Sequence, residues 1–292
     1  MLAFALALAL PAGAARQALP RSTVDRPDDV QGSQIHAIYV IPSDGTDRGL
    51  DTNGTIESSV QAWNSWLASQ TGGRGGLRLD TYGGALDVSF FRDPSTDAEI
   101  AAQGAYVRDF LQSDLNYAGF FAPDKIYAVY YDGSSTYSCG GGAYPPLLPG
   151  DVAAMYLHGR PPGAIPCDQT TFVPNGSPGY FEFGMVHEIF HTLGFVPSCA
   201  PHETLTGHVS DATNDLMYSG DAPWQLPPTL DVGHDDYFDT GRTDCLDFAN
   251  SPYLVSNTPH VTKIATPAKP KPKIPKCRKG QRSTKRKPCH RT

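Results

Sequence analysis

The chain has 292 residues, of which 40% are hydrophobic and 18% charged, so it can bury a sizeable core and is neither disordered nor fibrous. Its 29 glycines and 26 prolines follow no Gly-X-Y period, which excludes a collagen and favours a globular, loop-rich protein. Residues 261–292 hold twelve of the 23 basic residues and none of the 30 acidic ones, so the rest of the chain is strongly acidic. Such a body is not expected to bind nucleic acid non-specifically.

The first 33 residues predict export and a leader. An apolar run from Leu2 to Leu10 is followed by small residues up to Ala15, which is typical of a secretory signal peptide over residues 1–15. The run is too short to span a bilayer, and no other stretch reaches the roughly 18 apolar residues of a transmembrane helix. Residues 16–33 are polar and contain prolines, which predicts a flexible leader. We therefore expect a secreted protein.

The first half of the following domain alternates strands and helices. Residues 34–42 are rich in β-branched and aromatic side chains, which predicts a central strand. Residues 55–70 carry apolar side chains at helical spacing and are followed by a glycine-rich stop. Residues 77–82 and 85–91 alternate around Gly83-Gly84, which predicts a hairpin or two neighbouring strands.

The second half continues this alternation. Residues 97–115 predict a helix, and residues 125–132 predict another buried strand. After a long glycine- and proline-rich loop, we expect a short strand near residues 152–157 and a helix over about 180–193 that ends at a left-handed Gly194. The order β-α-β-β-α-β-β-α predicts an α/β fold with one mixed, twisted sheet.

The last predicted helix contains the sequence His-Glu-Ile-Phe-His. Because residues four apart share one face of a helix, His187 and His191 can hold one zinc ion, and Glu188 can reach a water molecule on that metal. A metal that polarises a carbonyl and a carboxylate that takes a proton are the requirements of peptide hydrolysis. The alternative is an amphipathic helix whose histidines are merely packed or solvated.

The motif resembles that of the metzincin metallopeptidases, HExxHxxGxxH followed by a methionine turn. His187, Glu188, His191 and Gly194 match this signature, whereas Pro197 stands where the third histidine is expected. Two histidines follow, His202 and His208, and either can be the third zinc ligand.

The run from His208 to Tyr218 resembles the matrixin-type stretch between the third histidine and the methionine turn. This favours His208 over His202 as third ligand, with an insertion of 11 residues after Gly194 that carries Cys199 and His202. A disulfide through Cys199 would anchor that insertion. The resemblance further implies that Met217 forms an apolar floor beneath the zinc and that Tyr218 lines the site.

The resemblance implies a metzincin-like zincin catalytic domain over residues 34–257, with an active-site helix and a loop-rich C-terminal subdomain. The expected activity is that of a secreted, monomeric zinc endopeptidase with Glu188 as general base, acting on protein or peptide substrates. By resemblance, the substrate lies along an edge strand, which we expect near residues 152–157.

Six cysteines in an exported chain indicate disulfides. Cys277 and Cys289 share the basic tail and are expected to pair with each other. The other four allow three pairings, among which the sequence does not choose; they are Cys139, Cys167, Cys199 and Cys245. A cysteine zinc site is disfavoured, since no C-x-x-C spacing occurs.

An acidic cluster follows the methionine turn and comprises Asp231, His234, Asp235, Asp236 and Asp239. It can coordinate Ca²⁺ through its carboxylates, but a solvated turn is favoured, because no 12-residue loop with ligand periodicity is present. His234 is also a remote candidate zinc ligand.

Residues 258–292 alternate lysine with proline, which predicts an extended, solvated tail. The tail can bind an anionic cell-wall or membrane-surface polymer, or act only as a spacer. The rival to a peptidase is a non-catalytic exported surface protein that uses zinc for folding and this tail for anchoring. Glu188 argues against the rival, because a structural zinc site has no need of a base beside the metal.

Overall fold

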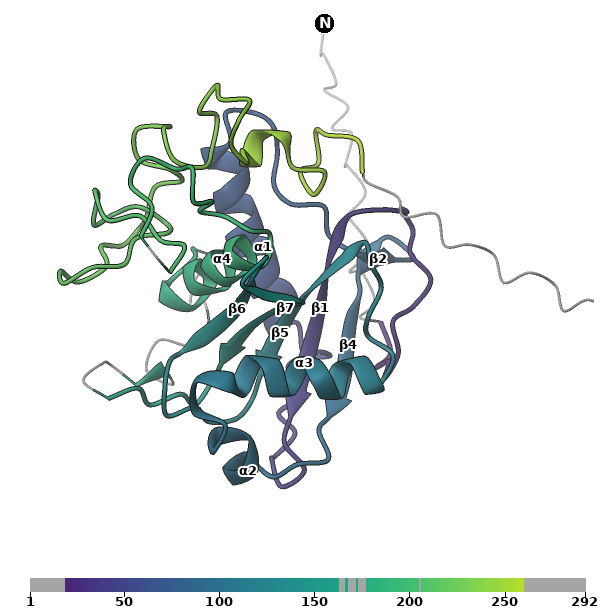
Figure 1. Cartoon of the computed structure of the whole chain (residues 1–292). Helices are drawn as coiled ribbons and strands as arrows, with labels where there is room; N and C mark the ends of the chain where they lie inside the picture. The colour runs from purple at the N-terminus through teal and green to yellow at the C-terminus, as the bar shows by residue number, and fades with distance from the viewer. Residues whose placement is uncertain (1–18, 163–165, 168–171, 173–176, 205, 260–292) are drawn as a thin grey trace, which may run out of the picture. The chain divides into compact units, whose positions relative to one another are not determined.

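The computed structural model of the chain describes residues 19–162, 166–167, 172, 177–204 and 206–259 (Figure 1). All of these belong to one compact unit within residues 1–261. The predicted signal peptide, the basic tail and the Cys277–Cys289 pair lie outside the described residues. Within the described part of the chain, no helix combines the length and the hydropathy needed to cross a membrane.

The domain is built on a five-stranded sheet in the order β4-β1-β5-β7-β6. Four strands run parallel, and they are β1 (Gln34–Ile41), β4 (Val88–Arg92), β5 (Lys125–Tyr131) and β7 (Leu148–Tyr156). The strand β6 (Gly140–Tyr144) pairs antiparallel with β7. The prediction of an α/β fold with a mixed sheet is thus confirmed.

Helices cover both faces of this sheet. The helices α1 (Thr55–Gln70) and α4 (Tyr180–Thr192) lie on one face, and α3 (Val107–Tyr117) lies on the other (Figure 1). Alternate side chains of β1 and β5 therefore belong to two separate hydrophobic clusters, one with α1 and α4 and one with α3. Burial on both faces explains why β1 and β5 are mostly apolar; their polar residues, Gln34, His36 and Lys125, are buried as well.

The helix predicted over residues 97–115 is divided. Thr96 and Glu99 form a capping box that starts α2 (Asp97–Ala101). Gly104 has a φ of 58°, which no helix accepts, and it opens a short 3-10 turn before α3 begins. Helical spacing on both sides of this glycine concealed the break.

The predicted hairpin around Gly83-Gly84 is present but short. The strands β2 (Thr81–Tyr82) and β3 (Ala85–Leu86) pair antiparallel, and the chain then enters the main sheet as β4. Both glycines have positive φ, as a tight turn of this kind requires.

The edge strand lies elsewhere than predicted. The strand β7 contains residues 152–156, but β5 pairs with one side of it and β6 with the other, so it is not an edge. The two edges of the sheet are β4 and β6, and β6, the neighbour of β7, lies in a segment predicted as a loop. Three consecutive glycines, Gly140 to Gly142, give this segment a poor strand signal.

Residues 19–33, predicted as part of a flexible leader, lie against the domain. The Lys125 ammonium group contacts the carboxylates of Asp25 and Asp28 at 2.6 Å each, and Phe90 donates its backbone N–H to Ser22 at 2.7 Å. Arg26 forms an ion pair with the buried Asp87. From residue 19 on, the segment predicted as a flexible leader therefore makes specific contacts with the domain.

The described residues after α4 are mostly loops, and their only helix is η3 (Phe248–Asn250). Two disulfides resolve the pairing that the sequence left open: Cys139–Cys167 and Cys199–Cys245. The second joins the segment after α4 to the segment before η3.

Candidate metal centre

The helix α4 presents the His-Glu-x-x-His motif from a buried position. Ten of its thirteen residues are buried, which is typical of a helix enclosed on all sides. It ends in a Schellman motif at Gly194, whose φ is 89°: Gly194 donates to the carbonyl of His191 and Phe195 to that of Phe190, each at 2.9 Å. The left-handed Gly194 that the sequence predicted is therefore where the chain leaves the helix.

Three imidazoles converge beside this helix. The Nε2 atom of His191 lies 3.0 Å from that of His187 and 3.0 Å from that of His208, and the latter two are 3.2 Å apart. His208 comes from the loop that follows α4. The structure brings His208 to this point, whereas His202 lies against Asp236.

The other ring nitrogens determine what this trio can bind. His187 donates its Nδ1 proton to the backbone carbonyl of Leu216 at 2.7 Å, so its Nε2 offers a lone pair. The Nδ1 of His208 lies 2.9 Å from the Thr206 hydroxyl, and the Nδ1 of His191 is buried without a partner among the described residues. Lone pairs that face one point cannot satisfy one another, so the donor set fits a shared metal cation and suits zinc in particular.

The surroundings keep these imidazoles neutral, which is the form that binds a metal. Burial lowers the pKa of His187, and burial together with the neighbouring imidazoles lowers the pKa of His191 well below its ordinary value. Burial, with a contribution from His187, lowers the pKa of His208 to about 3.

Glu188 adds a carboxyl group at the edge of the trio. It lines the same cavity as His187 and His208 and lies close to the glycines of β6. Burial raises the pKa of Glu188 to about 8, although the Gly142 N–H and the charge of Arg108 favour the carboxylate. A carboxyl group held in this way can exchange a proton near neutral pH.

The turn of residues 215–218 contacts His187 and the residue after His208 through its backbone. Met217 is fully buried, and its carbonyl accepts the N–H of Val209, the residue after His208, at 2.9 Å. The preceding carbonyl, of Leu216, holds His187. Asp215, which the sequence reasoning missed, accepts the Met217 N–H at 2.7 Å; a carboxylate directly before the buried Leu216-Met217 pair is the signal that could have revealed it.

A cavity of about 630 Å³ opens beside the trio and reaches His187, Glu188 and His208. Tyr218 is among its lining residues. The other large lining side chains are apolar or aromatic, and they are Met155, Tyr180, Pro223, Trp224 and Leu226. The cavity is therefore suited to a bulky apolar group of a ligand.

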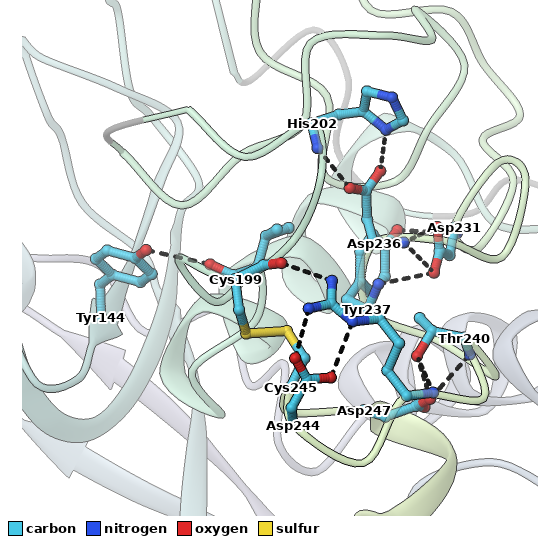
Figure 2. Close-up of a disulfide and its surroundings, with 12 residues drawn as sticks. Tyr144, Cys199, His202, Asp231, Asp236, Tyr237, Thr240, Asp244, Cys245 and Asp247 are labelled. Atoms are coloured by element: carbon cyan, nitrogen blue, oxygen red, sulfur yellow. Dashed lines mark hydrogen bonds and ion pairs between the residues drawn. A yellow bond between two sulfur atoms is a disulfide. The ribbon is translucent and has the colours of Figure 1, made fainter.

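The insertion between Gly194 and His208 is fastened at several points. The Cys199–Cys245 disulfide joins it to the C-terminal loops, and Arg242 donates to the Cys199 carbonyl at 2.7 Å (Figure 2). His202 points at Asp236, with its Nδ1 atom 3.1 Å from one carboxylate oxygen and its N–H 2.8 Å from the other (Figure 2). At the base of the insertion, the Tyr144 hydroxyl of β6 donates to the Val196 carbonyl at 3.1 Å.

The acidic cluster is divided among several partners. Asp231 is buried and accepts the N–H groups of Tyr237 at 2.8 Å and Phe238 at 2.6 Å, which closes a turn. Asp239 forms an ion pair with Arg74, and His234 lies against the Phe238 carbonyl, away from the imidazole trio. Asp235 and Asp236 remain near Asp231. Calcium binding at this cluster stays a prediction.

A second group of histidine and carboxylates lies under residues 19–33 and already contains cations. His36 lies 2.6 Å from Asp80, and Lys125 contacts the same carboxylate at 2.7 Å. Because Lys125 and Arg26 neutralise this group, it is an internal ion-pair network, unlike the cation-free imidazole trio.

No protein family model and no curated protein match the sequence. Among solved structures, archaemetzincin of Methanopyrus kandleri is similar at 14% identity and a TM-score of 0.34, over 64% of this chain and 82% of that one. OgpA of Akkermansia muciniphila is similar in two crystal forms, at 15% identity with a TM-score of 0.40 and at 14% with 0.35. These matches cover 72% and 62% of this chain, and 60% and 51% of that protein. Because their TM-scores are below 0.5, these matches are not used to assign a function, and a functional proposal must rest on the residues of the site.

Proposed function

We propose that the protein is a secreted zinc-dependent endopeptidase of metzincin type. The observation that carries the proposal is the convergence of the Nε2 atoms of His187, His191 and His208 within 3.2 Å of one another, with the Glu188 carboxyl group beside them. Three neutral imidazoles and an open position are typical of a catalytic rather than a structural zinc site.

The three histidines would hold zinc, and zinc there would polarise the carbonyl of a peptide bond and lower the pKa of water. The Glu188 carboxylate takes a proton from the attacking water as the new C–O bond forms. It then returns a proton to the amide nitrogen as the C–N bond breaks, so that one water molecule yields a new carboxyl terminus and a new amino terminus. Burial raises the pKa of Glu188 to about 8, which makes its carboxylate a stronger base than that of an ordinary glutamate.

The edge strand β6 would hold the substrate in an extended conformation. It lies against α4, and its outer side has no neighbouring strand among the described residues. An extended peptide can add to such an edge through main-chain hydrogen bonds. A substrate side chain beside the cleaved bond can then enter the cavity lined by Trp224 and Tyr180.

The test is digestion of a diverse mixture of unfolded proteins by the purified mature protein, beside Glu188→Ala, with zinc content measured on both. We expect cleavage by the wild type alone and equal zinc in both, because Glu188 is not a ligand. Glu203→Gln, which changes a carboxylate in the insertion, is the matched control and should cleave like the wild type.

Equal zinc in both proteins with no cleavage by either would favour the rival, a zinc-stabilised surface protein. Absence of zinc from both would contradict the metal assignment itself. The role of the tail is tested separately: deletion of residues 261–292 should abolish binding to an acidic polymer if the tail anchors the protein, and should change nothing if it is a spacer.

A further inference from the structure

We propose that Asp215 is a positioning residue for the imidazole trio, acting through the turn of residues 215–218. This inference rests on the proposed zinc site. Asp215 is buried, with 1% of its surface exposed, and its carboxylate accepts three hydrogen bonds. One oxygen accepts the Met217 N–H at 2.7 Å and the Tyr237 hydroxyl at 2.8 Å, and the other accepts the Val232 N–H at 2.7 Å.

The turn that Asp215 shapes fixes two of the three imidazoles. The Leu216 carbonyl accepts the Nδ1 proton of His187 at 2.7 Å, which sets the tautomer and the ring orientation of that residue. The Met217 carbonyl accepts the N–H of Val209 at 2.9 Å, and Ser219 donates to the Val209 carbonyl at 3.1 Å. Both contacts hold the loop segment that carries His208, so a shift of the turn displaces both rings.

Asp215 also fixes one wall of the cavity. Its backbone carbonyl accepts the indole N–H of Trp224 at 2.7 Å, and the indole ring lies 5.9 Å from the His187 ring, measured between centroids. The residue thereby connects zinc geometry and the shape of the substrate cavity.

The geometry explains why a carboxylate is needed at this position. All three partners of the side chain are donors, and an asparagine would offer one acceptor oxygen and one NH₂ donor group. In Asp215→Asn, the NH₂ group faces the Val232 N–H in one orientation of the amide and the Met217 and Tyr237 donors in the other. In either orientation a buried donor loses its acceptor. The turn must then move.

The experiment compares Asp215→Asn with Asp247→Asn. Asp247 is a matched control, because it is also buried in the C-terminal loops and also accepts backbone N–H and hydroxyl hydrogen bonds, from Asp239, Thr240 and Ala249. It has no contact with the trio. We expect Asp215→Asn to weaken zinc binding about 10- to 100-fold, the usual effect of a changed partner behind a metal ligand, and Asp247→Asn to keep wild-type zinc affinity.

Two further readouts separate this inference from the proposed activity. In the metal-free protein, NMR should detect the His187 Nδ1–H proton in the wild type and in Asp247→Asn, and a shifted or fast-exchanging proton in Asp215→Asn. With a peptide substrate, Asp215→Asn should lower kcat, and not only change KM. If the wild-type protein binds zinc but cleaves no peptide, the peptidase proposal is contradicted. The inference about Asp215 is then still tested by the zinc affinity and by the His187 NMR signal.

Unchanged zinc affinity together with an unchanged His187 signal in Asp215→Asn would overturn the inference. If Asp215→Asn does not fold, Tyr237→Phe serves instead, because it removes one donor to Asp215 and keeps the carboxylate; it also removes the acceptor of the Asp231 N–H. We expect Tyr237→Phe to lower zinc affinity less than Asp215→Asn does and to shift the His187 signal. Wild-type values for both quantities would overturn the inference.

Discussion

The backbone of Gly142 in β6 lies directly against His191 in α4. A Cβ atom on Gly142 would stand 2.9 Å from the Cβ of His191, closer than real Cβ atoms approach, and would overlap the Glu188 carbonyl oxygen. The edge strand can therefore lie this close to the metal centre only because the residue has no side chain.

Gly142→Ala should disturb this contact. We expect overpacking to destabilise the protein by about 1–3 kcal/mol and to reduce zinc affinity, because His191 must move. Thermal unfolding and zinc titration measure the two effects. Gly179→Ala is the control, since its Cβ would meet only Glu182, at 3.6 Å; equal behaviour of the two variants would show that the contact is unimportant.

His208→Ala should release zinc from the purified protein, whereas His202→Ala should retain it. The reason is that the His208 Nε2 lies 3.0 Å from that of His191, while His202 is held by Asp236. Metal analysis after dialysis distinguishes the variants. Full zinc in His208→Ala and its loss in His202→Ala would transfer the third ligand to His202.

Removal of the Cys199–Cys245 disulfide should destabilise the protein. The two cysteines are 46 residues apart, and a bridge of this span restricts the unfolded chain by an amount worth about 2–4 kcal/mol. The double serine variant should unfold at lower urea concentration and should bind zinc more weakly, because the bridge fastens the insertion that precedes His208. A urea midpoint equal to that of the wild type would contradict this expectation.

Acid should weaken the fold through Asp132. Burial works to raise the pKa of Asp132, but hydrogen bonds from His158, Arg48 and Tyr39 outweigh it and lower the pKa from 3.8 to about 2. Because the pKa is lower in the folded state, the contribution of about 2 kcal/mol is present above pH 4 and is lost as the pH falls towards 2.

Urea unfolding of the wild type and of Asp132→Asn at pH 6 and pH 2 measures this contribution. The variant should be less stable at pH 6, and the difference should shrink at pH 2. Asp244→Asn, which removes an exposed partner of Arg242, should show little difference at either pH. A gap between wild type and Asp132→Asn that does not change with pH would refute the assignment.

Local patterns predicted much of the fold. The apolar spacing of residues 55–70, the strands rich in β-branched and aromatic side chains at 34–42 and 125–132, and the left-handed Gly194 all correspond to observed elements, because each depends on neighbours within a few residues. The break at Gly104 escaped prediction because helical spacing continues on both sides of this positive-φ glycine. The strand β6 escaped prediction because its glycines give a weak local signal and its pairing with β7 decides its conformation.

The amino-acid sequence by itself determined that two histidines and a glutamate share one helix, because spacing along a helix fixes which side chains lie together. It left His202, His208 and, as a remote candidate, His234 for the third zinc ligand, and it left three possible pairings of four cysteines. Only the tertiary structure decided which histidine joins His187 and His191, and which cysteines pair. It also decided that Asp215 holds the turn behind these histidines. Those relationships join segments tens of residues apart, and they depend on how the loops pack against the sheet and α4, which no local pattern encodes.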